Sequence, residues 1–145
     1  MPEIEPTATV RKLVVGVDGS DGSTKALDWA IAEAVRSPAS LELVTAWMFP
    51  MALGYVFAKT PDEVRQQVQQ IIDISVSRVA AIAPNVSVRS ILREAEAGPA
   101  LVELSTGADL LVVGSRGHGG LREMLLGSVG TYCARHSHCS TVIVH

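Results

Sequence analysis

Short apolar runs alternate along this chain with longer segments in which apolar residues recur every three or four positions. The short runs are typical of strands buried on both faces, and the longer spacing is typical of helices with one apolar side. The strands predicted in this way are residues 13–17, 41–46, 86–92, 110–113 and 141–144. The predicted helices are residues 24–36, 60–83, 99–106 and 128–136.

Strict alternation of strand and helix predicts an α/β fold, in which right-handed crossovers build one parallel sheet with helices on both faces. No internal repeat or linker divides the chain, so residues 11–145 are expected to form a single domain after a mobile tail, residues 1–10. In such sheets a ligand binds beyond the carboxyl ends of the strands, where the strand order reverses. Three segments should meet there: Gly16-Val17-Asp18, Ala46, and the chain from Gly114 onward.

Composition narrows the possible functions. The 145 residues are 48% hydrophobic and 19% charged, which is enough apolar material for one core. The net charge of −3 offers no basic surface for nucleic acid. No apolar run has the length of a membrane span, and the acidic start Met1–Pro6 is not a secretory signal, so we expect a cytoplasmic protein. Cys133 and Cys139 do not form a CxxC pair, which favours free thiols in a reducing compartment.

A glycine cluster, Gly114-Ser-Arg-Gly117-His-Gly119-Gly120, directly follows the predicted strand 110–113, and Gly127-Ser128 precedes the last predicted helix. Glycines let backbone N–H groups approach an anion closely, and a helix start adds unpaired N–H donors. The alternative is that the glycines only make a tight turn. A Walker A loop is excluded because no Gly-Lys-Ser/Thr is present, and the dinucleotide fingerprint fails because Arg122 stands where its last glycine should be.

The spacing Gly114-x2-Gly117-x9-Gly127-Ser128 resembles the ATP-binding signature of the universal stress protein family. The resemblance covers nearly the whole chain. It includes Val-Gly16-Val-Asp18-Gly-Ser near the start, Ala-Asp109-Leu-Leu-Val-Val-Gly before the glycines, and Cys-Ser-Thr-Val-Ile-Val144 at the end. It implies a Rossmann-like open sheet with strand order 3-2-1-4-5.

The resemblance also implies roles for matching positions. Asp18 would lie near the ribose or a phosphate bridged by Mg²⁺, which makes it a possible metal contact through water. Gly16, Val17 and the backbone at Ala46 would line the adenine, and Gly114 the ribose. The later glycines, with Ser128 and Val129, would hold the phosphates. The candidate nucleotide-binding residues are Gly16, Val17, Asp18, Ala46, Gly114, Ser115, Arg116, Gly117, His118, Gly119, Gly120, Gly127, Ser128 and Val129.

Several of these residues keep a simpler explanation. Asp18 precedes a glycine and is a common turn residue in that position. Arg116, His118 and Arg122 are either phosphate contacts or solvated loop charges. The segment 47–59 holds four of the six aromatic residues and is predicted to be a loop that forms a lid, forms a partner surface or folds onto the core.

A cluster near the end of the chain invites a metal hypothesis, but its residues match no standard zinc spacing. Its members are Cys133, His136, His138 and Cys139.

The function predicted from these features is regulatory. ATP, with Mg²⁺, would switch the conformation or the partners of a stress-response protein. The resemblance also implies a homodimer through the last strand, Thr141–Val144. No Walker lysine and no evident general base are present, so at most slow hydrolysis is expected. The alternatives are a cyclic AMP sensor and a nucleotide-dependent phosphotransfer enzyme.

Overall fold

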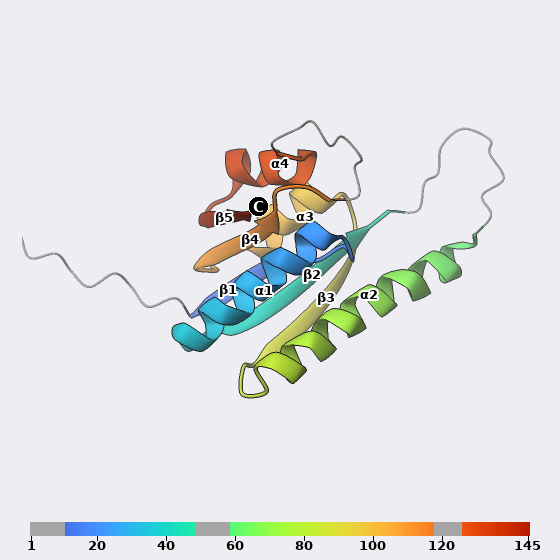
Figure 1. Cartoon of the computed structure of the whole chain (residues 1–145). Coiled ribbons are helices and arrows are strands. Elements are labelled where there is room, and N and C mark those ends of the chain that lie inside the picture. The colour runs from blue at the N-terminus through green and yellow to red at the C-terminus, as the bar shows by residue number, and fades with distance from the viewer. Residues whose placement is uncertain (1–10, 49–58, 118–125) are drawn as a thin grey trace, which may run out of the picture.

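The computed structural model describes residues 11–48, 59–117 and 126–145. Within these ranges one parallel sheet has the strand order β3-β2-β1-β4-β5 (Figure 1). Its strands are β1 (Lys12–Gly16), β2 (Ser40–Trp47), β3 (Val88–Glu94), β4 (Leu110–Gly114) and β5 (Ser140–Val144). The predicted α/β fold and strand order are confirmed. The predicted tail, residues 1–10, lies outside the described residues.

The described helices cover both faces of the sheet, two on each (Figure 1). They are α1 (Asp21–Arg36), α2 (Pro61–Ile82), α3 (Ala97–Leu104) and α4 (Ser128–His136). β1 shows why a central strand is apolar throughout: Leu13 and Val15 pack into the core beneath α1 and α2, and Val14 packs into the core beneath α3 and α4. No helix within the described ranges is both long and apolar enough to span a bilayer.

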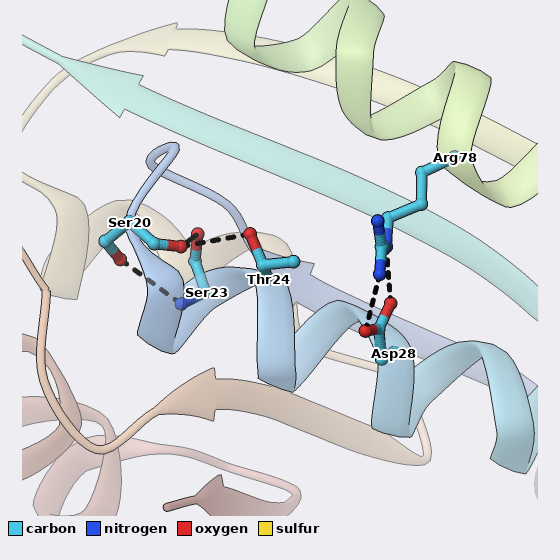
Figure 2. Close-up of polar contacts among 5 residues, drawn as sticks. All are labelled: Ser20, Ser23, Thr24, Asp28 and Arg78. Carbon is cyan, nitrogen blue, oxygen red and sulfur yellow. Dashed lines mark hydrogen bonds and ion pairs between the residues drawn. The ribbon is translucent and has the colours of Figure 1, made fainter.

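Helix α1 begins at Asp21, three residues before the predicted start at Thr24. Ser20 is its cap, because the Ser20 hydroxyl accepts the Ser23 backbone N–H at 3.2 Å, and the Thr24 hydroxyl donates to the Ser20 carbonyl at 3.1 Å (Figure 2). The predicted start was wrong because Asp-Gly-Ser is typical of a turn, whereas Asp21-Gly22-Ser23 forms the first turn of this helix.

Helices α1 and α2 are tied together on the surface by Asp28 and Arg78. The Arg78 Nε and Nη2 atoms donate to the two Asp28 carboxylate oxygens at 2.6 and 2.8 Å (Figure 2). The bidentate pair raises the pKa of Arg78. Each side chain is 43% exposed, so solvent screens the pair and it fixes geometry more than it stabilises the fold.

The segment predicted as an aromatic loop, residues 47–59, begins later than expected. Trp47 is the last residue of β2 and lies opposite Glu94 of β3. The guanidinium of Arg65 lies 5.8 Å from the centre of the Trp47 ring, which is a cation–π distance. Residues 49–58 lie outside the described residues.

β3 ends at Glu94, two residues after the predicted end of that strand at residue 92, and α3 begins at Ala97, two residues before its predicted start at residue 99.

Candidate functional site

A cavity of about 910 Å³ opens at the carboxyl edge of the sheet, between the ends of β1 and β4 and the first turns of α1 and α4. The strands diverge at this point. Beyond β1 the chain follows β2, because the Val17 N–H donates to the Val44 carbonyl at 2.9 Å. Beyond β4 it follows β5, because the Ser115 N–H donates to the Val144 carbonyl at 2.9 Å. The cavity therefore lies where the strand order reverses, the usual ligand position in such sheets.

Most of the sequence-predicted site residues line this cavity. The lining contains Gly16, Val17, Asp18, Ala46, Gly114, Ser115, Arg116, Gly117, Gly127, Ser128 and Val129. The other three candidates, His118, Gly119 and Gly120, lie outside the described residues, as does Arg122.

Other residues, which were not predicted from the sequence, line the same cavity. They are Gly19, Ser20, Asp21, Gly22, Ser23, Lys25, Val44, Ala97, Leu101, Val113, Gly130 and His145. A usable signal existed for half of them, because a helix after the first strand of such a sheet begins at the carboxyl edge. Placing the start of α1 at Asp21 would have brought Gly19 to Lys25 into the site.

Two glycines bring the first turn of α1 against the segment after β4. A Cβ atom on Gly22 would collide with the carbonyl oxygen of Arg116. A Cβ atom on Gly114 would lie 2.7 Å from the carbonyl carbon and oxygen of Gly22. Backbone therefore packs on backbone here, and any side chain at these two positions would push α1 away from the cavity wall.

The N-terminus of α4 lines the cavity, and its first N–H groups have no acceptor within the helix. Gly127 is the N-cap and has no side chain to accept them. The first helical hydrogen bond runs from the Thr131 N–H to the Gly127 carbonyl at 3.0 Å. The N–H groups of Ser128, Val129 and Gly130 therefore have no acceptor inside the helix. No acidic residue lies in the first turn, so the positive end of the helix dipole is uncompensated by the helix itself.

Asp18 has a turn role in the structure. Its Oδ1 atom accepts the Ser20 N–H at 2.9 Å and the Ser20 hydroxyl at 2.5 Å, so it orients the residue that caps α1. Its Oδ2 atom faces Gly117, where an added Cβ would lie 2.7 Å away. The carboxylate is half-buried and borders the cavity. The turn interpretation is therefore correct, and the ligand role stays a prediction.

The two ends of the cavity differ in character. The end formed by β2 and α3 is apolar and is lined by Val44, Ala46, Ala97 and Leu101. The end formed by the segment after β4 and by the start of α4 is rich in glycine and backbone N–H groups. A ligand with a flat apolar part and an anionic part would match both ends.

The possible metal residues near α4 do not form a cluster. Within the described ranges no group of three or more His, Cys, Asp and Glu side chains is placed to hold a metal ion. Cys133 is fully buried in the core beneath α3 and α4. Burial, with a smaller effect from Cys139, raises the pKa of the Cys133 thiol to about 11. Cys133 is therefore a neutral core residue at neutral pH.

Comparison with known proteins identifies related sequences and a family. The sequence model of the Universal stress protein family matches residues 9–145. The chain is 33% identical over 144 residues to universal stress protein YxiE of Bacillus subtilis, a match that covers 92% of this chain and 97% of YxiE. It is also 33% identical over 141 residues to universal stress protein Rv2623 of Mycobacterium tuberculosis. That match covers 92% of this chain and 47% of Rv2623, so the chain spans about half the length of this relative.

Solved structures agree with this result. A universal stress protein crystallised in complex with cAMP is 31% identical, with a TM-score of 0.75, and the match covers 95% of this chain and 98% of that one. A universal stress protein from Archaeoglobus fulgidus has a TM-score of 0.74 at 19% identity, and the match covers 93% of this chain and 98% of that one. At this low identity the likeness shows the fold alone. Because the family model spans nearly the whole sequence, the chain belongs to the universal stress protein family.

Proposed function

We propose that this chain binds ATP in the cavity at the carboxyl edge of the sheet and acts as a nucleotide-dependent regulatory switch. The observation that carries the proposal is the uncapped N-terminus of α4, which presents three N–H groups to the glycine-rich end of a cavity of about 910 Å³. This volume is near the upper end of the usual range for small-molecule sites, roughly 300–1,000 Å³. It suits a ligand as large as a nucleoside triphosphate.

The two ends of the cavity suggest how ATP would lie. The adenine would rest on the apolar end, against Val44 and Leu101. The phosphates would accept hydrogen bonds from the N–H groups at the start of α4. Charge-assisted hydrogen bonds of this kind are about twice as strong as neutral ones.

Mg²⁺ would fit this arrangement as a companion of the phosphates. Proteins usually hold Mg²⁺ through one or two carboxylates together with substrate phosphates, and seldom through a complete protein cage. The half-buried carboxylate of Asp18 borders the glycine-rich end of the cavity and supplies one such group. When bound, Mg²⁺ would offset the charge repulsion between that carboxylate and the phosphates.

Cyclic AMP is the second candidate ligand, because the relative at 31% identity was crystallised with cAMP. The abundance of backbone donors favours ATP, since a triphosphate offers more anionic oxygens than a cyclic monophosphate. Calorimetric titration with ATP, with and without Mg²⁺, and with cAMP distinguishes the two. Tighter binding of ATP supports the proposal, and failure of ATP to bind at millimolar concentration contradicts it. Mass spectrometry of nucleotide released from the purified protein would identify a ligand carried from the cell.

The proposal is a switch and not an enzyme of high turnover, and a nucleotide-dependent phosphotransferase is the alternative. Asp18 is already engaged by Ser20 through Oδ1, which suits positioning more than proton transfer. Turnover of ATP well above a slow background, abolished by Asp18→Ala, would favour the enzyme.

We further propose that residues 11–145 act as one nucleotide-binding unit in the cytoplasm.

We also propose a homodimer through β5. This strand pairs only with β4 among the described strands, so its outer edge has no partner strand within residues 11–48, 59–117 and 126–145. Its apolar residues Val142, Ile143 and Val144 are only half-buried. A second copy would cover these groups. Sedimentation at micromolar concentration should give the mass of two chains, and the mass of one chain would contradict the dimer.

A further inference from the structure

Lys25 is a cation at the cavity that the sequence analysis did not select. It lies in the second turn of α1, four residues after Asp21 and three after Gly22, and it lines the cavity. Residues three and four apart share one side of a helix, so Lys25 lies on the side of α1 that packs on the segment after β4. Helical side chains lean toward the N-terminus, which here is the cavity edge.

The position of Lys25 separates it from the apolar end of the cavity. Val44 and Ala46 are on β2, whereas the Gly22 side of α1 faces Gly114 and Arg116 at the end of β4. A nucleotide with its base on the apolar end and its first phosphate on α4 would therefore extend its further phosphates toward Lys25. The side chain is exposed and has a flexible stem, so it can follow a ligand.

The charges around Lys25 favour a phosphate partner. No ion pair joins Lys25 to another described residue, although Asp21 is one turn away on the same helix. Among the described residues, the other charged or titratable groups that line the cavity are Asp18, Arg116 and His145. Two carboxylates on the α1 side would repel an incoming phosphate, and a lysine on that side offsets this repulsion.

We propose that Lys25 binds the terminal phosphate of the nucleotide and makes the cavity prefer nucleoside triphosphates over monophosphates. This inference rests on the proposed binding of nucleotide in the cavity. It assigns the preference to one side chain on α1, while the start of α4 holds the phosphate that all the nucleotides share.

The test is calorimetric titration of the full chain with ATP, AMP and cAMP, for the unaltered protein and three variants. Lys25→Gln removes the charge and keeps a good helix former. Lys25→Arg keeps the charge. Lys59→Gln is the matched control, because Lys59 is an exposed lysine that does not line the cavity.

Lys25→Gln should weaken ATP binding about tenfold, as expected for one charge-assisted contact at an exposed site, and should leave AMP and cAMP binding within about twofold. Lys25→Arg should retain most of the affinity for ATP, and Lys59→Gln should match the unaltered protein.

Equal weakening of ATP and AMP by Lys25→Gln, or no weakening of ATP, would overturn the inference while nucleotide binding itself stands. If the unaltered protein bound none of the nucleotides, the proposed function would fail, and this inference with it.

Discussion

Helices α1 and α4 both start at the same cavity, but their first turns are built differently. At α1 the Ser20 hydroxyl accepts the Ser23 N–H, and Asp21 adds a negative charge to the first turn. At α4 the cap is Gly127, which has no side chain, and the first turn contains no acidic residue. The donors of α1 are therefore partly satisfied by its own cap, whereas those of α4 have no acceptor in the helix or its cap.

This difference assigns separate roles to the N-termini of the two helices. An anionic ligand gains most from α4, where both the N–H groups and the helix dipole favour it. Helix α1 supplies the wall: its Gly22 packs on the Arg116 backbone and its cap is oriented by Asp18. A helix N-terminus thus binds the ligand in α4 and supports the cavity wall in α1.

The largest expected effect comes from disrupting the contact between the first turn of α1 and the backbone after β4. Gly22→Ala should destabilise the fold by about 3 kcal/mol, because its Cβ atom would collide with backbone that cannot move without shifting a strand end. Denaturant unfolding measures the change. Gly127→Ala is the matched control in the other helix, since its φ is −73° and its Cβ would lie 3.4 Å from the Ser115 carbonyl oxygen. Similar losses of stability in both variants would contradict the difference between the helices.

Making α4 resemble α1 should abolish most of the binding. Gly127→Asp places a capping carboxylate at the start of α4, where it would accept the N–H groups and repel phosphate. We expect ATP affinity to fall about 100-fold, which corresponds to about 2.7 kcal/mol, with stability unchanged or higher. Gly127→Asn is the control, because it caps without the charge and should lose less affinity. Wild-type ATP affinity in Gly127→Asp would show that the phosphates lie elsewhere.

Removing the cap of α1 should affect stability and leave binding largely intact. Ser20→Ala deletes the hydroxyl that accepts the Ser23 N–H, and loss of such a cap costs about 1 kcal/mol. Thermal unfolding reports the stability, and calorimetry should show a much smaller loss of ATP affinity than in Gly127→Asp. If ATP affinity fell equally in Ser20→Ala and Gly127→Asp, α1 would also be an anion site.

The smallest expected effect concerns Asp109, which lies at the amino ends of the strands, away from the cavity. Asp109 accepts the backbone N–H groups of Arg11 and Lys12, both at 2.9 Å, and these bonds lower its pKa. A lowered pKa in the folded state stabilises the fold above the usual pKa of an aspartate, and this contribution disappears as the pH falls through the lowered value. Asp109 is exposed, so the contribution is small.

Asp109→Asn should flatten the acid dependence of the unfolding midpoint without changing ATP affinity at neutral pH. An acid dependence identical to that of the unaltered protein would contradict the role of Asp109.

Periodicity was sufficient to predict an α/β fold with a parallel sheet, because strands such as Leu110–Gly114 are apolar throughout and helices alternate with strands. The strand order came from the family resemblance. It was not sufficient to place the start of α1. Gly22 is unfavourable in a helix, and its reason for being there is close contact with Arg116, which lies 94 positions away in the printed sequence. Local preference cannot report such a contact.

In the candidate site, too, local patterns were predictable and long-range contacts were not. Gly127 and Ser128 were predictable because glycines before a helix are a local pattern. Leu101 was not, because it reaches the cavity only by packing beside Gly16 on another element. Lys25 was missed because a single lysine on a helix is usually a solvated surface charge.

Amide NMR during titration with ATP tests most directly whether the start of α4 holds the phosphates. We expect the amide signals of Ser128, Val129 and Gly130 to shift most, and those of Ser23 and Thr24 at the start of α1 to shift much less. Largest shifts at Ser23 and Thr24, or none at Ser128 to Gly130 when the cavity is saturated, would contradict it.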